Sequence, residues 1–262
     1  MLYSPSACGS SGSSLMKNGF HLFDSHTHMG TARHRDRTVT ADDLLRDMDR
    51  HGVDRSMAIP YPVVAEHREQ HDLIGRAALA HPDRLAGAAC LYPYIPVAEF
   101  RDEVKRCREV YGFSALKLQP QYHGLNPFSA SSDFFFETAF ENGMAVICHT
   151  GTGMPFASPA LCMMPARRFP DLKIVLGHCG GGIYVHEAIV AALFCPNIYL
   201  EMSSLMPHHV REVLDHVPSD RLMIGSDLPE SVAIEFAKIL DMEIADEDKR
   251  NILSATASRV FV

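Results

Sequence analysis

Hydrophobic and polar positions follow two alternating patterns along this chain of 262 residues. Short, nearly continuous apolar runs begin near residues 20, 55, 84, 114, 144, 172, 197 and 221, and segments with helical spacing separate them. The repeat of about 24–35 residues is the size of one βα unit. Strands this apolar are typical of a parallel sheet that is covered on both faces. Eight such units predict an α/β fold, a (β/α)8 TIM barrel, formed by residues 20–262 as a single domain.

An open, doubly wound sheet is the alternative architecture for the same alternation. Sheets of that kind that bind dinucleotides carry a glycine-rich phosphate loop after the first strand. No such loop follows the first apolar run of this chain, so the barrel is favoured.

Residues typical of helix ends mark several boundaries. Thr40 and Asp43 have the spacing of a capping box, and Gly52 and Gly112 are placed to end helices. The final segment, residues 246–261, predicts one more helix packed on the barrel. Residues 1–19 are rich in serine and glycine, and we expect them to form a disordered lead.

Composition narrows the range of partners. The formal net charge of −8 and a pI near 6.0 argue against nucleic-acid binding and against an anionic membrane surface. No apolar stretch reaches the ~18 residues that a membrane span needs. Seven cysteines, scattered along the chain, fit a reduced, cytoplasmic protein better than a disulfide framework. We therefore expect a small-molecule substrate and leave self-association into a homo-oligomer open.

Polar residues gather where the predicted strands end. His26 and His28 lie on one side of the first strand, and His149, His178 and Asp227 end three later strands. In a barrel all these ends meet at the C-terminal mouth, where active sites form. Each residue alone has an ordinary explanation, such as a core histidine or a helix-capping aspartate. Together they predict a site for one divalent metal ion, with Zn²⁺ favoured and Mn²⁺ the alternative.

Three further residues are candidates for substrate binding. Lys117, near the end of the fourth strand, is placed to bind a substrate carboxylate or, if carboxylated, to bridge two metal ions. Glu201, late in the seventh strand, is placed either to orient a ligand histidine or to contact substrate. Arg35, together with Arg33, lies in the loop after the first strand and is placed to clamp a carboxylate over the mouth.

The motifs DSHTH, HTG, GHCGG and GSD, in this order, resemble those of the amidohydrolase superfamily. They are most similar to the amidohydrolase-related branch that includes the aminocarboxymuconate-semialdehyde and resorcylate decarboxylases. The resemblance covers about residues 20–262 and implies that His178 is the catalytic acid/base, with Asp227 sharing in proton transfer. It further implies that one metal ion, usually zinc, is held by His26, His28, His149 and Asp227.

Two positions depart from the pattern of that branch. Many relatives carry a histidine after the strand-4 lysine, as in KLHP, whereas this chain has Gln119 in KLQP. Thr256 stands in the terminal helix where asparagine is usual, a change that we expect to affect packing rather than chemistry. The resemblance also implies that Lys117 need not be carboxylated.

The same predicted site suits more than one function. The favoured interpretation is a metal-dependent hydrolase, in which a metal-activated water attacks the carbonyl of an amide, lactone or ester of a small acid. The alternative is the non-oxidative decarboxylation of an aromatic or enoic acid. Hydrolysis is favoured because the chain is short for such decarboxylases and lacks tryptophan, although Tyr61, Tyr92, Tyr94 and Phe128 are candidate aromatic walls. The complete ligand set disfavours a third interpretation, an inactive barrel that serves as a binding protein.

Overall fold

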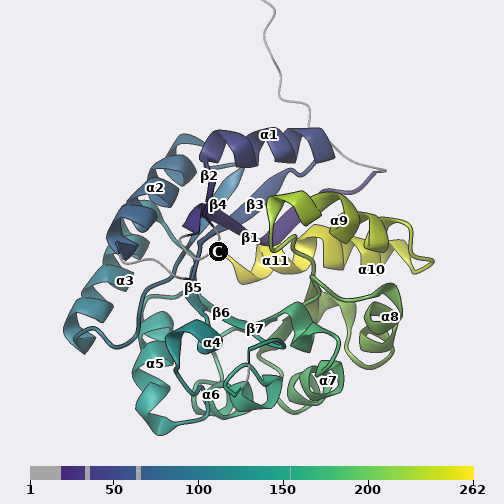
Figure 1. The fold of residues 1–262 in the computed structure, drawn as a ribbon. Helices are drawn as coiled ribbons and strands as arrows, with labels where there is room; N and C mark the ends of the chain where they lie inside the picture. The colour runs from purple at the N-terminus through teal and green to yellow at the C-terminus, as the bar shows by residue number, and fades with distance from the viewer. Residues whose placement is uncertain (1–18, 33–35, 63–65, 154) are drawn as a thin grey trace, which may run out of the picture.

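A curled sheet ringed by helices forms the molecule (Figure 1). The computed structural model describes residues 19–32, 36–62, 66–153 and 155–262. Within them the strands pair in the order β2-β1-β3-β4-β5-β6-β7-β8-β9, and every pair is parallel except β1 with β2. The strands are β1 (Phe23–Ala32), β2 (Arg37–Val39), β3 (Arg55–Pro60), β4 (Leu85–Ala89), β5 (Ala115–Leu118), β6 (Ala145–His149), β7 (Ile174–Gly177), β8 (Ile198–Glu201) and β9 (Leu222–Met223).

The parallel strands follow the predicted rhythm of apolar runs. The largest offset is at the first strand, predicted near residue 20 and beginning at Phe23. β2 was not predicted. It is a three-residue antiparallel addition to the far end of β1, outside the eight-unit repeat. The TIM-barrel prediction is therefore confirmed.

Backbone hydrogen bonds between β1 and the segment after β9 close the sheet into a barrel. The Ser25 amide donates to the Ile224 carbonyl at 3.0 Å, and the Asp227 amide donates to the His26 carbonyl at 2.7 Å. This close approach depends on Gly225, because a Cβ atom there would lie 2.6 Å from the His26 Cβ. The closure places Asp227 directly beside the two histidines of β1.

Helices cover the outside of the barrel and seal its core. The Thr40–Asp43 capping box is present at the start of α1, and Gly52 and Gly112 end α1 and α3 in left-handed conformations, as predicted. The helices are α1 (Ala41–His51), α2 (His67–Ala80), α3 (Val97–Tyr111), α4 (Pro120–His123), α5 (Asp133–Glu141), α6 (Met163–Arg168), α7 (Val185–Phe194), α8 (Pro207–His216), α9 (Val232–Leu240), α10 (Asp246–Arg250) and α11 (Thr256–Val260).

A small apolar cluster fills the barrel interior away from the mouth. Side chains such as Met57 and Ile147 pack there against Ala257 and Phe261 at the end of the chain. The Phe23 and Phe261 rings lie 6.3 Å apart, and the C-terminus ends near the barrel centre in Figure 1. The final segment, which contains a π-helical turn between α10 and α11, therefore plugs one end of the barrel and leaves the other end to polar residues.

Three further predictions concern the whole chain. The six described cysteines are buried free thiols, in keeping with the expectation that the chain has no disulfide framework. Among the described residues, no helix combines the length and apolar character needed to cross a membrane. The predicted disordered lead falls almost entirely on residues outside those described, so it stays a prediction, as do the cytoplasmic location and the homo-oligomer.

Candidate metal centre

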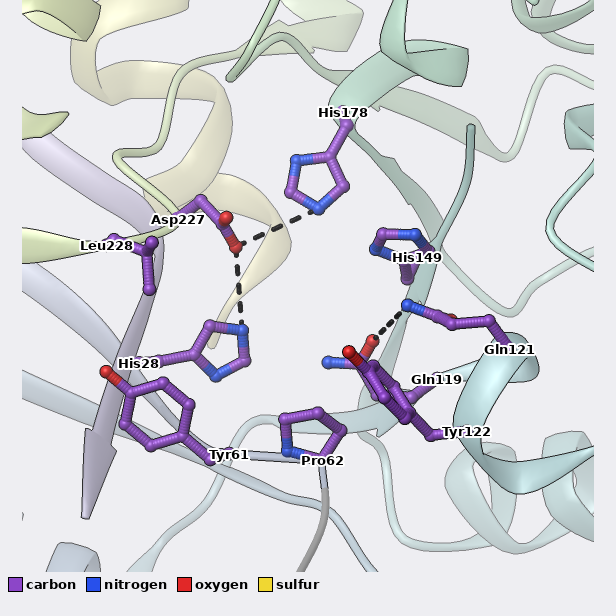
Figure 2. Close-up of a pocket in the computed structure, with 10 residues that line it drawn as sticks. All are labelled: His28, Tyr61, Pro62, Gln119, Gln121, Tyr122, His149, His178, Asp227 and Leu228. Atoms are coloured by element: carbon purple, nitrogen blue, oxygen red, sulfur yellow. Dashed lines mark hydrogen bonds and ion pairs between the residues drawn. The ribbon is translucent and has the colours of Figure 1, made fainter. Parts of the chain in front are cut away.

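The predicted site residues come together at the C-terminal ends of the strands. His26 and His28 belong to β1, His149 ends β6, and His178 directly follows β7. Asp227 lies four residues after the end of β9, where it forms an isolated parallel bridge with Thr27 of β1. Figure 2 shows His28, His149, His178 and Asp227 around one pocket, with their polar atoms turned towards its centre.

Fixed acceptors determine which nitrogen of His26 and His28 carries a proton. His26 Nδ1 lies 2.9 Å from Glu201 Oε2, and His28 Nδ1 lies 3.1 Å from the Pro60 carbonyl oxygen. Carboxylate and carbonyl oxygens only accept hydrogen bonds, so both rings are protonated on Nδ1 and keep the Nε2 lone pair. Those two Nε2 atoms point towards Asp227, and this is the arrangement that a metal-ligating pair needs.

His149 and His178 are oriented in the same way by different partners. His149 Nε2 donates to the Thr152 carbonyl at 2.8 Å, which leaves its Nδ1 lone pair available. His178 Nδ1 lies 2.7 Å from Ser203 Oγ, whose own proton goes to Glu201 Oε2 at 2.9 Å. The serine oxygen therefore accepts from His178 Nδ1, and His178 Nε2 is the atom free to exchange a proton in the pocket.

Burial sets the charge of the site. Burial is the main reason that the pKa values of His28 and His149 fall to about 4. It also lowers the pKa values of His26 and His178 well below the usual range of histidine. Burial alone would raise the pKa of Asp227, but the surrounding histidines and a nearby lysine hold it below its ordinary value. Neutral imidazoles around an ionised carboxylate are the donor set that a divalent cation prefers.

The spacing of the donor atoms fits one ion. His26 Nε2 and His28 Nε2 lie 3.8 and 3.6 Å from Asp227 Oδ1. Two ligands that each bind zinc at about 2.0–2.1 Å in tetrahedral directions lie about 3.4 Å apart. His26, His28 and Asp227 are one of the described groups whose donor atoms lie within 4.8 Å of one another, whereas His149 belongs to no such group and faces the pocket from β6. A four-ligand site therefore requires the His149 donor atom to lie closer to at least one of the other three than it does in this structure.

Lys117 lies behind the pocket instead of lining it. It is fully buried in β5, its Nζ is 2.8 Å from His26 Nε2, and burial lowers its pKa. A cation bound at His26 would compete for the lone pair that this contact uses. The predicted role of Lys117 in substrate binding stays a prediction. Arg33 and Arg35, the other predicted carboxylate ligands, lie outside the described residues.

Glu201 is the central hydrogen-bond acceptor behind the site. Its carboxylate accepts from His26 Nδ1, from the backbone amides of His178, Ser203 and Gly225, and from the Ser203 hydroxyl. Its contacts match the first of the two predicted roles, orientation of a ligand histidine. Asp24 has a similar supporting place, since it accepts from the amide and hydroxyl of Ser226, and burial raises its pKa to about 7.

Residues other than the predicted metal ligands complete the pocket, and two of them were not predicted. Tyr61, one of the predicted aromatic walls, lies stacked on His28 with ring centroids 5.0 Å apart. Gln121 and Tyr122, which were missed, line the same pocket beside Gln119. Their place immediately after β5 was the signal that could have found them, because loops at the C-terminal ends of barrel strands form the mouth. Tyr92, Tyr94 and Phe128, the other candidate walls, are about half exposed and do not line it.

Comparisons with known proteins agree with this fold and site. The model of the amidohydrolase family matches residues 20–262. A search of curated proteins gave no match. Solved structures that share the fold include the 4-oxalomesaconate hydratase LigJ from Rhodopseudomonas palustris. It has 18% sequence identity and a TM-score of 0.72, and the match covers 92% of this chain and 95% of LigJ.

Two decarboxylases are among the other structures with this fold. The 5-carboxyvanillate decarboxylase from Novosphingobium aromaticivorans, complexed with manganese and 4-hydroxy-3-methoxy-5-nitrobenzoic acid, has a TM-score of 0.72 at 15% identity, covering 94% of this chain and 97% of that one. A 2,6-dihydroxybenzoate decarboxylase complexed with 2,6-dihydroxybenzoate has a TM-score of 0.73 at 16% identity, covering 92% and 98%. Relative length therefore gives no support to hydrolysis over decarboxylation.

The barrel and its polar mouth define a member of a class of metal-dependent TIM-barrel enzymes. The family match over residues 20–262 makes the assignment specific: the chain belongs to the amidohydrolase family, and the resemblance to its amidohydrolase-related branch is confirmed.

Proposed function

We propose that this protein is a metal-dependent, non-oxidative decarboxylase of a small aromatic or enoic acid. The observation that carries the proposal is the pocket itself, where three of the four candidate metal ligands (His28, His149 and Asp227) and His178 line the same space as the aromatic side chains Tyr61 and Tyr122. Similar folds with manganese and with bound hydroxybenzoic acids support this reaction over the hydrolysis favoured by the sequence.

The donor set assigns roles to the residues. His26, His28, His149 and Asp227 would hold one divalent ion, Zn²⁺ or Mn²⁺, which when bound would attract an oxygen of the acid and withdraw electron density from it. Tyr122 would contact the flat face of the substrate, and Tyr61, which stacks on His28, would form part of the aromatic wall beside it. These contacts would place the carboxylate-bearing carbon beside the proton-exchanging groups.

His178 and Asp227 would move the proton. His178 Nε2 lies 3.9 Å from Asp227 Oδ1, and both atoms face the pocket. His178 Nε2, which is unprotonated at rest, would take up a proton from water and deliver it to the substrate carbon. The bond to the carboxylate carbon would then break, its electron pair would stay with the substrate, and CO₂ would leave. Ser203 and Glu201 keep the His178 ring in the tautomer that presents Nε2.

The first test is metal content together with His178→Ala. We expect the purified protein to bind about one equivalent of Zn²⁺ or Mn²⁺ by elemental analysis, and H178A to lose turnover while keeping nearly all of the metal. A protein that takes up neither ion would refute both enzyme interpretations and leave the inactive barrel. Loss of metal in H178A would make His178 a ligand instead of an acid/base.

The second test separates decarboxylation from hydrolysis. Metal-loaded protein is incubated with hydroxybenzoates and enoic acids, with CO₂ release as the readout, and in parallel with lactones and amides of small acids, with acid release as the readout. Turnover confined to the lactones or amides would overturn the proposal.

A further inference from the structure

Gln119 stands where many relatives have histidine, and the structure holds its backbone firmly at the edge of the pocket. It follows β5 directly, its amide donates to His123 Nδ1 at 3.3 Å, and its carbonyl accepts from the His123 amide at 2.8 Å. The residue is only 2% exposed, and it lines the pocket. A buried polar side chain fixed in this way needs hydrogen-bond partners.

One end of the Gln119 amide has a partner and the other faces the pocket. Gln121 Nε2 donates to Gln119 Oε1 at 3.3 Å. Figure 2 shows the Gln119 nitrogen turned away from Gln121 and into the pocket, and no described residue accepts a hydrogen bond from it. Gly153 packs closely against the Gln121 side chain, since a Cβ atom added at Gly153 would lie 2.4 Å from the Gln121 Cβ.

The orientation of the Gln119 and Gln121 side-chain amides can be deduced from the buried atom that has no hydrogen-bond partner. The unpartnered buried atom of the two amides is Gln121 Oε1. Flipping both amides would keep one hydrogen bond between them but bury the NH₂ group of Gln121 instead. A buried N–H group without an acceptor is rarer and costlier than an under-satisfied carbonyl oxygen. Gln119 therefore presents its N–H groups, not its oxygen, to the pocket.

The charge of the pocket makes this donor informative. None of the described residues that line the pocket and its adjoining lobe is a lysine or an arginine. The buried Lys117 is hydrogen-bonded to His26 and does not line the pocket. Within the described residues, Gln119 Nε2 is thus a pre-oriented hydrogen-bond donor for an anionic oxygen. Unlike the pocket histidines and Asp227, Gln119 has no proposed part in metal binding or acid/base chemistry.

We propose that Gln119 determines substrate specificity by donating a hydrogen bond from Nε2 to a carboxylate oxygen of the acid. This inference rests on the proposed function, because it assigns the residue that recognises the acid group in the same pocket. A neutral donor to a charged oxygen contributes enough to change affinity about ten- to hundredfold.

The experiment exchanges donor for acceptor at one atom. Manganese-loaded wild type and Gln119→Glu are titrated by calorimetry with 2,6-dihydroxybenzoate and with its neutral analogue 2,6-dihydroxybenzamide. We expect Q119E to bind the benzoate about ten- to hundredfold more weakly and to bind the benzamide as well as or better than wild type, since a carboxylate repels an anion and accepts from an amide. Gln70→Glu, the same change on α2 beside β1, is the control for net charge and should leave both affinities unchanged.

Each other outcome is decisive. Unchanged benzoate affinity in Q119E, or equal losses for both compounds with manganese content intact, overturns the specificity role and leaves the proposed function standing. A wild type that binds manganese but neither compound overturns the proposed function and this inference with it. If Q119E does not fold, Gln119→Met, which removes the donor without adding charge, must lose the preference for the benzoate.

Discussion

Replacing Glu201 with glutamine should weaken metal binding without touching a proposed ligand. Glutamine can keep the oxygen that accepts from the Ser203 and Gly225 amides at 2.6 and 3.0 Å. Its NH₂ group then faces His26 Nδ1, the His178 amide and the Ser203 hydroxyl, which are 2.9, 3.1 and 2.9 Å from Oε2. The hydroxyl can rotate to accept, but the other two donors lose a charged acceptor.

The expected effects follow from those two contacts. Hydrogen bonds to a charged group contribute about 1.5–3 kcal/mol each, so the free energy of unfolding of the metal-free protein should fall by about 3–5 kcal/mol. In E201Q the N–H group of the new side chain faces His26 Nδ1, so the His26 proton must move from Nδ1 to Nε2. This move removes the Nε2 lone pair that is proposed to bind metal. Loss of such an orienting partner typically lowers metal affinity about 10–100-fold.

Two measurements and one control variant test this reasoning. Urea unfolding of the metal-free E201Q protein gives the stability change, and competition with a chelator gives the Mn²⁺ affinity. Glu103→Gln is a matched control, because Glu103 Oε1 also accepts from a buried histidine, His71 Nδ1, at 2.8 Å, but between α2 and α3. It should lose stability and keep its Mn²⁺ affinity. An E201Q protein with affinity within about threefold of wild type would refute the role of Glu201 in orienting His26.

Three smaller predictions concern the frame of the site. Thr40→Ala removes the acceptor that holds the Asp43 amide at 3.1 Å, so urea unfolding should show a loss of about 1 kcal/mol with Mn²⁺ affinity unchanged. Gly225→Ala places a methyl group 2.6 Å from the His26 Cβ, so the same assays should show a loss of about 1–3 kcal/mol together with weaker Mn²⁺ binding. Burial alone would raise the pKa of Glu103, but hydrogen bonds from its histidine and arginine partners hold that pKa below its ordinary range. The stabilisation is therefore present above the unfolded pKa of about 4.3 and is lost as the pH falls towards the folded value, so the stability difference between wild type and E103Q should shrink from pH 7 to pH 3.5.

The sequence was sufficient for those parts of the fold that depend on local periodicity. Each parallel strand is a nearly continuous apolar run that must be covered on both faces, so its position follows from composition alone. The Thr40–Asp43 capping box is equally local, since both residues lie within one helical turn. The HxH spacing of His26 and His28 fixes a shared face of β1 by strand alternation. All three predictions use contacts between residues close in sequence.

The sequence was insufficient where the chemistry depends on contacts between strands. Lys117 and His26 are 91 residues apart, and nothing in either motif shows that Lys117 Nζ lies 2.8 Å from His26 Nε2. The 175-residue separation of His26 and Glu201 hides the acceptor that selects the His26 tautomer. Gln119 could be read as a departure from a pattern, but its donor orientation required the Gln121 contact. Strand order and register, set by the closed sheet, decide all of these contacts.

Backbone strain at the mouth also depends on contacts between strands that are far apart in sequence. Of the five described non-glycine residues with positive φ, three line the mouth, namely His178, Ser204 and Asp227, and a fourth, Cys179, directly follows His178. Each such residue raises the energy of the fold by about 1–3 kcal/mol, so local preference predicts glycine at these positions. Hydrogen bonds across the barrel offset the strain, since the His178 amide donates to Glu201 at 3.1 Å and the Asp227 amide to the His26 carbonyl at 2.7 Å. Relaxing either turn would move a proposed proton-transfer group away from the pocket, so these contacts maintain the geometry of the site at the expense of local stability.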